Sequence, residues 1–229
     1  MNELSTVTSE RDVRQRALVP PERLAQCDAV VIGVGAIGRQ VALQLAALGV
    51  PRLSLFDDDI VQAENLAPQG YWPGDLNRPK VSATAHLCQC IQPLVHVTAI
   101  AQRFKRSTVR DWPTSSERIV FCCVDSIVTR RLIWETIRSS ALLFVDGRMS
   151  AEVMRVLAVD DPIGDDSYAR TLFTAKEAYV GACTAQSTIY TASIAAGLMV
   201  HQFTKWLRGL RIDRDLMLNL LAAETTSGE

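Results

Sequence analysis

The sequence has almost no excess charge and no long hydrophobic run, and each absence excludes a class of protein. Lysine and arginine number 24 against 25 aspartates and glutamates, which gives a net charge of −1. The chain therefore lacks the overall basic character of nucleic-acid-binding proteins, and we expect no nucleic-acid partner. No apolar run reaches the roughly 18 residues of a membrane-spanning helix. Residues 1–4 lack a charged-then-apolar secretion signal. We therefore expect a cytoplasmic protein that does not cross a membrane.

The sequence also lacks the paired cysteines of a structural metal site. Six cysteines are present, but no two are spaced as C-x-x-C, so a structural zinc ion is not expected. Cys88 and Cys90 lie in an apolar helical segment and Cys122 and Cys123 in an apolar strand, where we expect all four to be buried. Cys183 differs, because small and polar residues surround it just before a long apolar segment. A helix N-terminus lowers the pKa of a nearby thiol, so Cys183 is a candidate nucleophile; the alternative is an incidental loop cysteine.

A glycine-rich turn follows the first apolar run of the chain, residues 29–32. It reads Gly33-Val34-Gly35-Ala36-Ile37-Gly38 and precedes a segment with helical spacing. Glycines let the backbone turn sharply and approach a phosphate, and the N-terminus of the following helix offers free N–H groups to it. Gly33, Gly35 and Gly38 therefore predict a nucleotide site, and the alternative is a tight turn without a ligand.

Polar residues at the ends of later apolar runs extend this predicted site. Asp57 ends the second run, about 20 residues after the turn, where a carboxylate can accept hydrogen bonds from ribose hydroxyls. Asn65 and Lys80 follow, and a second polar group with a cation suits a triphosphate better than a nicotinamide. Asp125 follows a buried strand, at the edge where open α/β sheets bind ligands. The alternatives are helix caps for Asn65 and Asp125 and solvated positions for Asp57 and Lys80.

Strand and helix patterns alternate through the first half of the chain, which predicts a parallel sheet with crossover helices. Strands are expected at 29–32, 53–56, 95–100, 119–124 and 141–146, and helices at 37–48, 80–90 and 127–139. The second half instead predicts an antiparallel strand at 152–159, a loop-rich stretch at 160–182 and a long apolar helix at 188–207. The expected fold class is α/β, a Rossmann-like, mostly parallel sheet with an added antiparallel C-terminal part.

The motifs occur in an order that resembles one superfamily. The chain carries Arg14-Gln15, the glycine-rich turn, Asp57-Asp58-Asp59-Ile60-Val61, Asn65-Leu66, Gln69, Asn77-Arg78-Pro79-Lys80 and Cys123-Val124-Asp125-Ser126. This set resembles the ThiF/MoeB/ubiquitin-activating superfamily, whose pattern runs RQ, GxGxxG, DxDxV…NLxRQ, GxxK and a late Asp. The resemblance covers about residues 11–209. One position departs from it, because Pro68 stands where the family has an arginine that contacts phosphate.

The resemblance implies an adenylation domain that uses ATP and Mg²⁺ to activate the C-terminal carboxylate, on glycine, of a small ubiquitin-fold protein. It implies nucleotide binding by the three glycines, Asp57, Asn65 and Lys80, with Asp59 shared or merely a solvated neighbour. It places Asp125 beside the magnesium ion. The chain resembles the compact bacterial form of these activating enzymes, which is usually a homodimer, and Arg14 would then reach the nucleotide of the partner subunit; the alternative is a solvated basic arm. The expected organisation is an N-terminal arm and short helix (1–28), an adenylation domain (29–221) and a frayed tail (222–229). The domain divides into a nucleotide-binding half (29–150) and a carrier-protein half (151–221).

Three functions fit this sequence. In the first, Cys183-Thr184, which is similar to the thioester site of ubiquitin-like activating enzymes, accepts the activated carrier and passes it to a conjugating enzyme. In the second, the chain only adenylates a sulfur carrier for thiamine or molybdopterin synthesis. In the third, motivated by Pro68, the chain is a non-catalytic binding module with a degraded site. The first is the expected function.

Overall fold

A computed structural model describes residues 11–111, 117–172 and 187–228. Its centre is one eight-stranded sheet with the spatial order β3-β2-β1-β4-β5-β6-β7-β8. The strands are β1 (Cys27–Ile32), β2 (Arg52–Phe56), β3 (His96–Ile100), β4 (Glu117–Cys122), β5 (Leu143–Ser150), β6 (Val153–Val159), β7 (Asp215–Asn219) and β8 (Glu224–Gly228). The first five pair in parallel, and β5 to β8 pair antiparallel. The predicted fold class is therefore confirmed, including the antiparallel strand at 152–159.

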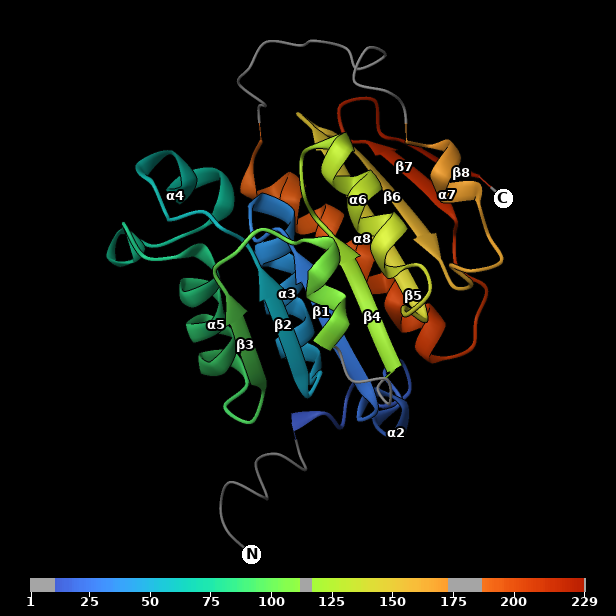
Figure 1. The fold of residues 1–229 in the computed structure, drawn as a ribbon, viewed down its shortest axis with the longest axis horizontal. Coiled ribbons are helices and arrows are strands. Elements are labelled where there is room, and N and C mark those ends of the chain that lie inside the picture. Colours follow the sequence, from blue (N-terminus) through green and yellow to red (C-terminus); the bar gives the residue numbers. More distant parts are fainter. Residues whose placement is uncertain (1–10, 112–116, 173–186, 229) are drawn as a thin grey trace, which may run out of the picture.

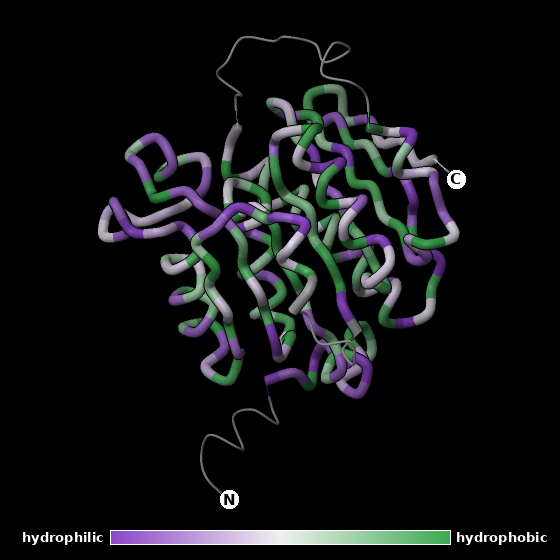
Figure 2. The backbone as a smooth tube through the Cα atoms, viewed as in Figure 1, coloured by the Kyte–Doolittle hydropathy of each residue, from purple (hydrophilic) through white to green (hydrophobic). Residues whose placement is uncertain are grey.

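Helices cover both faces of the sheet (Figure 1). The longer helices are α3 (Ala36–Leu48), α5 (Lys80–Ile91), α6 (Ile127–Ile137) and α8 (Ile189–Leu207). The short ones are α2 (Pro21–Leu24), α4 (Ala63–Gln69), α7 (Ser167–Arg170), η1 (Pro73–Asp75) and η2 (Arg106–Asp111). One hydrophobic core joins α3, α5 and α8 to one face, and a second joins α6 and α7 to the other. Figure 2 accordingly shows hydrophobic residues concentrated along the central strands and hydrophilic residues in the connections.

The strand register brings the polar motifs to one edge of the sheet. Ile32, the last residue of β1, pairs with Phe56 of β2 and with Cys122 of β4. The glycine-rich turn, Asp57 and Asp125 follow these three strand ends directly or within three residues. Because all three strands run in parallel, their carboxyl ends meet at a single edge.

Two expectations about the chain's second half and its cysteines are wrong. Residues 222–229 were expected to fray, but 224–228 form β8, which pairs with β7. The side chains of β8 are all exposed, so the strand is defined by main-chain pairing alone and its sequence has no hydrophobic pattern that would predict it. Cys90 was expected to be buried and is exposed, whereas Cys88 is buried. Residues two positions apart on a helix are rotated by about 200° around its axis, so the two cysteines of α5 face opposite sides.

No helix within the described residues is long and apolar enough to cross a membrane. The long helix α8 comes nearest in length, with 19 residues, but it carries Lys205 in its last turn. Its alanines pack against α3 and the sheet. The stripe of small residues in α8 therefore serves close packing inside the domain.

Candidate active site

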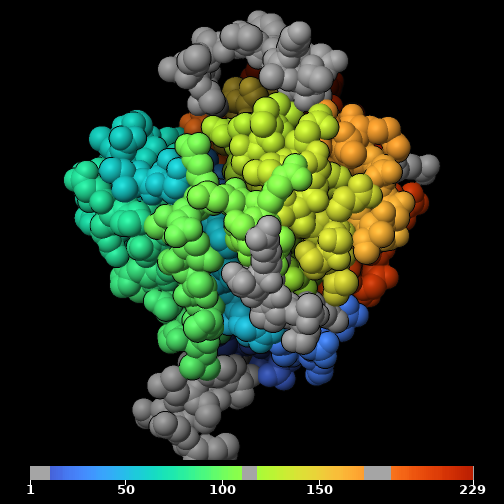
Figure 3. Space-filling model, in the orientation of Figure 1, coloured from blue at the N-terminus to red at the C-terminus, as the bar shows by residue number. Residues whose placement is uncertain are grey.

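A cleft of about 1080 Å³ lies at the carboxyl edge of the parallel strands. Seven of the predicted site residues line it: Gly33, Gly35, Asp57, Asp59, Asn65, Lys80 and Asp125. In Figure 3 the turquoise segment that contains α4 and the yellow-green segment that contains α6 are both visible on the face shown, and both helices contribute residues to the cleft. The cleft is at the upper end of the volumes that small-molecule sites occupy, which suits a nucleotide together with part of a second substrate.

The glycine-rich turn is held tightly against the end of β4. Gly33 has φ +87°, and a Cβ at this position would lie 2.9 Å from the carbonyl oxygen of Cys123. A Cβ on Gly38 would overlap the carbonyl oxygen of Gly33. Gly35, by contrast, lines the cleft, and apart from neighbours along the chain no described residue has an atom within 4 Å of where its Cβ would lie. Gly33 and Gly38 therefore shape the turn, while Gly35 leaves its backbone open to a ligand.

We predict that Gly38→Ala lowers the free energy of unfolding by about 3 kcal/mol, because overpacking against backbone cannot be relieved by a side-chain rotation. Gly35→Ala is the matched control in the same turn and is expected to change it by less than about 1 kcal/mol. Urea unfolding of the two variants measures the difference. Equal stability of the two variants would contradict this packing of the turn.

Asp57 closes the turn from the β2 side. Its Oδ2 accepts a hydrogen bond from the backbone N–H of Val34 at 2.7 Å, and its Oδ1 accepts one from Asp59 at 2.9 Å. Burial raises the pKa of Asp57, and these two hydrogen bonds oppose that rise. Each carboxylate oxygen has a further lone pair, so Asp57 can hold the turn and accept a hydrogen bond from a ligand.

Lys80 enters the cleft from the first residue of α5. Its side chain is 7 % exposed, and its ammonium pairs with Asp59 at 2.8 Å. The solvated-lysine alternative is therefore wrong. Asn77, three residues before it, adopts φ 65°, the left-handed conformation that asparagine tolerates better than most residues. Asn77 stands at the position where the GxxK pattern has glycine.

Asn65 and Pro68 both lie in α4. The side-chain oxygen of Asn65 accepts a hydrogen bond from the backbone N–H of Gln62 at 2.9 Å, so the capping role is present while the residue also lines the cleft. Pro68 is inside the helix, whose sequence AENLAPQ contains no lysine or arginine. The cation that the family carries on this helix is therefore absent from α4.

Asp125 faces the cleft from the loop before α6. The cap of α6 is Ser126, whose hydroxyl accepts a hydrogen bond from the backbone N–H of Thr129 at 3.3 Å. The alternative in which Asp125 caps this helix is therefore wrong. Asp125 is exposed, and among the described residues no hydrogen bond or ion pair engages its carboxylate. Its oxygens are available to a cation.

Tyr71 and Arg39 support the turn from behind, a role that the sequence did not reveal. The Tyr71 hydroxyl donates a hydrogen bond to the carbonyl oxygen of Val34 at 2.7 Å. The Arg39 guanidinium lies 4.6 Å from the centre of the Tyr71 ring. Arg39 is 3 % exposed, and burial lowers its pKa. Arg39 is neither an exposed helix cation nor part of the cleft lining.

Carboxylates outnumber cations in the cleft lining. Among the described residues, the five carboxylates belong to Asp57, Asp58, Asp59, Glu64 and Asp125, and the three cations to Lys80, Arg103 and Arg130. An anionic nucleotide in this cleft would therefore need further positive charge.

Two predicted catalytic residues are not placed in the cleft. Arg14 is exposed, and its neighbours Arg11 and Gln15 donate hydrogen bonds to Ala47 and Leu48, at the C-terminal end of α3. The glycine-rich turn is at the other end of this 13-residue helix, about 20 Å away. Cys183 lies outside the described residues.

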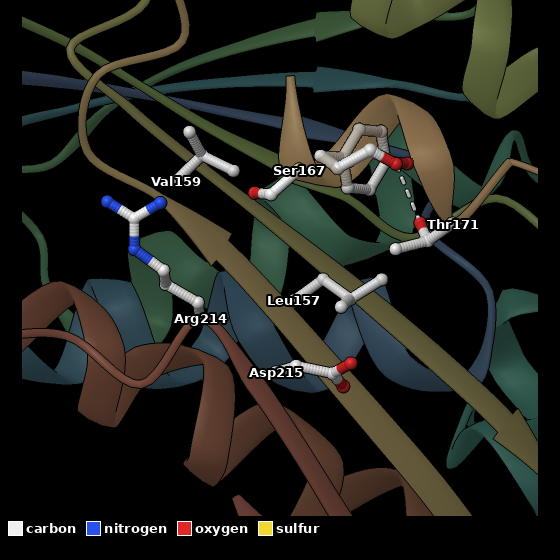
Figure 4. Close-up of a pocket in the computed structure, with 7 residues that line it drawn as sticks. Leu157, Val159, Ser167, Thr171, Arg214 and Asp215 are labelled. Carbon is white, nitrogen blue, oxygen red and sulfur yellow. Dashed lines mark hydrogen bonds between the residues drawn. The ribbon is translucent and has the colours of Figure 1, made fainter. Parts of the chain in front are cut away.

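A second cavity, of about 90 Å³, lies between α7 and the antiparallel strands (Figure 4). Thr171, at its wall, donates a hydrogen bond from its hydroxyl to the carbonyl oxygen of Tyr168 at 2.8 Å. Ligand sites are several times larger, so this cavity is no candidate for a nucleotide.

The chain is similar to several known proteins. The ThiF family profile matches residues 11–227. The sulfur carrier protein ThiS adenylyltransferase of Escherichia coli is 32% identical over 118 residues, covering 51% of this chain and 47% of that protein. The SAMP-activating enzyme E1 of Haloferax volcanii is 31% identical over 126 residues, covering 55% and 46%. The chain thus matches about half the length of these relatives.

Solved structures share the fold across nearly the whole chain. The structure of PaaA superposes with a TM-score of 0.76 at 20% identity, covering 98% of this chain and 83% of that one. E. coli MccB superposes with a TM-score of 0.80 at 15% identity, covering 96% and 69%. The fold, the cleft and the profile match across residues 11–227 agree: the chain belongs to the ThiF family.

Proposed function

We propose that the chain is an ATP-dependent adenylyltransferase that activates the C-terminal carboxylate of a small ubiquitin-fold protein. The observation that carries this proposal is the single cleft that unites the glycine-rich turn, Asp57, Lys80 and Asp125. Relatives named for acting on ThiS and as an activating enzyme for SAMP support the choice of partner.

In the proposed reaction, a carboxylate oxygen attacks the α-phosphorus of ATP, the bond to the β-phosphate breaks, and pyrophosphate leaves. The products are an acyl-adenylate and pyrophosphate. Gly33 and Gly35 bring the backbone close to the phosphates at the N-terminus of α3, and Asp57 accepts hydrogen bonds from the ribose. Lys80 neutralises developing negative charge in the transition state. The protein acts mainly by positioning and by electrostatics.

The residues present fit a magnesium ion. Asp125 offers an unengaged carboxylate beside the cleft, and Mg²⁺ binds through one or two carboxylates together with phosphate oxygens. When bound, Mg²⁺ would neutralise the negative charge of the phosphates. The described cleft lining cannot do this alone, because it has more carboxylates than cations. Asp59 is already paired with Lys80, so we propose Asp125 as the ligand.

The same charge deficit supports a homodimer in which Arg14 of one subunit approaches the nucleotide of the other. About 20 Å of α3 separates Arg14 from its own glycine-rich turn, so only a partner subunit would bring it near a nucleotide. An active species that light scattering finds monomeric at micromolar concentration would contradict the dimer.

The proposal includes a second step, in which the Cys183 thiolate attacks the acyl carbon, AMP leaves and a thioester forms. A conjugating enzyme would then accept the carrier. The alternative ends at the adenylate and delivers the carrier to a sulfur donor, and the relative that adenylates ThiS favours this ending. A further alternative, a binding module without activity, is motivated by Pro68.

ATP–pyrophosphate exchange tests the proposal. With the cognate ubiquitin-fold protein and MgATP, labelled pyrophosphate should enter ATP, because adenylate formation is reversible. Omitting the carrier protein or removing its C-terminal glycine should abolish the exchange. A chain that binds MgATP but never exchanges pyrophosphate with any candidate carrier would be a binding module instead.

A further inference from the structure

Two buried arginines share one carboxylate beside the cleft. Asp146 is fully buried, and the side chains of Arg130 and Arg148 are 6 % and 15 % exposed. Arg130 pairs with Oδ1 of Asp146, and Nε of Arg148 donates to Oδ2 at 2.7 Å. The hydroxyl of Tyr168 donates to the same Oδ2 at 3.1 Å. The Asp146 cluster, meaning these four residues, therefore carries two positive charges and one negative charge.

The Asp146 cluster lies close to the N-terminus of α3. Arg130 lines the cleft and donates a hydrogen bond from Nη2 to the carbonyl oxygen of Gly147 at 3.1 Å. A Cβ on Gly147 would lie 3.3 Å from Cγ2 of Ile37, which belongs to the first turn of α3. That turn contains no acidic residue. Arg130 is thus held near the helix end where the glycine-rich turn would present its N–H groups to phosphates.

The other cations of the described cleft lining are balanced one to one. Lys80 pairs with Asp59 at 2.8 Å, and Arg103 pairs with Asp58 at 2.7 Å. Arg130, by contrast, shares its carboxylate with a second guanidinium. Arg130 therefore differs from Lys80 and Arg103, because the Asp146 cluster to which it belongs has a net positive charge.

We propose that Arg130 is a phosphate-binding residue that takes over the role of the arginine missing at Pro68. The inference rests on the proposed nucleotide binding and adds a residue to it. Asp146 and Arg148 are positioning residues: the carboxylate fixes the Arg130 guanidinium, and Arg148 prevents the carboxylate from neutralising it fully. Arg148 is itself anchored, because Nη1 and Nη2 donate to the carbonyl and hydroxyl oxygens of Thr171 at 3.1 and 2.9 Å.

Calorimetric titration with the non-hydrolysable analogue AMPCPP and with adenosine, both in the presence of Mg²⁺, tests the inference. Arg130→Met removes the charge but keeps an unbranched apolar side chain of nearly the same reach. It should weaken AMPCPP binding at least about 10-fold and adenosine binding less than about twofold. A merely structural Arg130 would weaken both ligands alike. Arg131→Met is the control, because Arg131 is outside the cleft lining and donates to the Leu172 carbonyl oxygen at 2.6 Å.

Arg148→Met provides an independent measurement should Arg130→Met fail to fold. It leaves Arg130 and Asp146 as a neutral pair, so AMPCPP binding should weaken about threefold with adenosine binding unchanged. Unchanged AMPCPP affinity in every folded Arg130 or Arg148 variant would overturn the inference and leave the proposed function intact. A wild-type chain that does not bind AMPCPP would instead contradict the proposed function itself.

Discussion

Lys80→Met is expected to slow ATP–pyrophosphate exchange about 100-fold while the protein remains folded. Removing one preorganised group that stabilises transition-state charge typically costs two to three orders of magnitude in rate. Lys80 fits this role because its side chain is almost entirely buried and lines the cleft, and because Asp59 holds its ammonium at 2.8 Å. The stability cost should be small, because Asp59 is 61% exposed and water would solvate it once Lys80 is gone.

Arg78→Met is the matched control for Lys80→Met. Arg78 is a second cationic residue, two positions before Lys80. Its guanidinium pairs with Asp75 at 3.1 Å, and Arg78 does not line the cleft. Its loss should leave the exchange rate within about twofold, as surface substitutions usually do. If Lys80→Met exchanges pyrophosphate as fast as the wild type, Lys80 has no part in the reaction.

The parallel half of the fold was predictable because each of its signals is local. The apolar run before the glycine-rich turn is β1, and the segment after it is α3, which ends at Gly49 in the left-handed conformation. Asp57 and Asp125 each follow a buried strand. Parallel strands share one carboxyl edge, so knowing the strand ends was enough to predict that these two residues line one cleft.

The parts that sequence analysis missed depend on contacts between distant residues. Asp146 was recognised only as the end of an apolar strand, and two of its partners come from other elements, Arg130 from α6 and Tyr168 from α7. Tyr71 reaches the glycine-rich turn from 37 positions away. A single sequence carries no signal of such pairings, because each side chain alone has the pattern of an ordinary helix or loop residue.

Cys183→Ala is expected to abolish a covalent adduct between the chain and its ubiquitin-fold partner while leaving pyrophosphate exchange within about twofold. The acyl-adenylate forms before the thiol acts, so the first step does not need the cysteine. Cys123 lines the cleft, but burial raises the pKa of its thiol to about 12, so it is protonated near neutral pH and a poor nucleophile. Cys122 is fully buried, and its thiol pKa is raised to about 11 for the same reason.

Intact mass spectrometry with the partner and MgATP measures the adduct, which dithiothreitol should reverse if it is a thioester. Cys90→Ala is the control, because Cys90 is an exposed cysteine of α5 outside the cleft lining, and its removal should leave the adduct unchanged. An adduct that persists in Cys183→Ala would assign the thioester to another cysteine. A wild-type chain that exchanges pyrophosphate but never forms an adduct would favour the sulfur-carrier function. In that case no cysteine of the chain intercepts the adenylate, which must pass to an external sulfur donor or be lost to water.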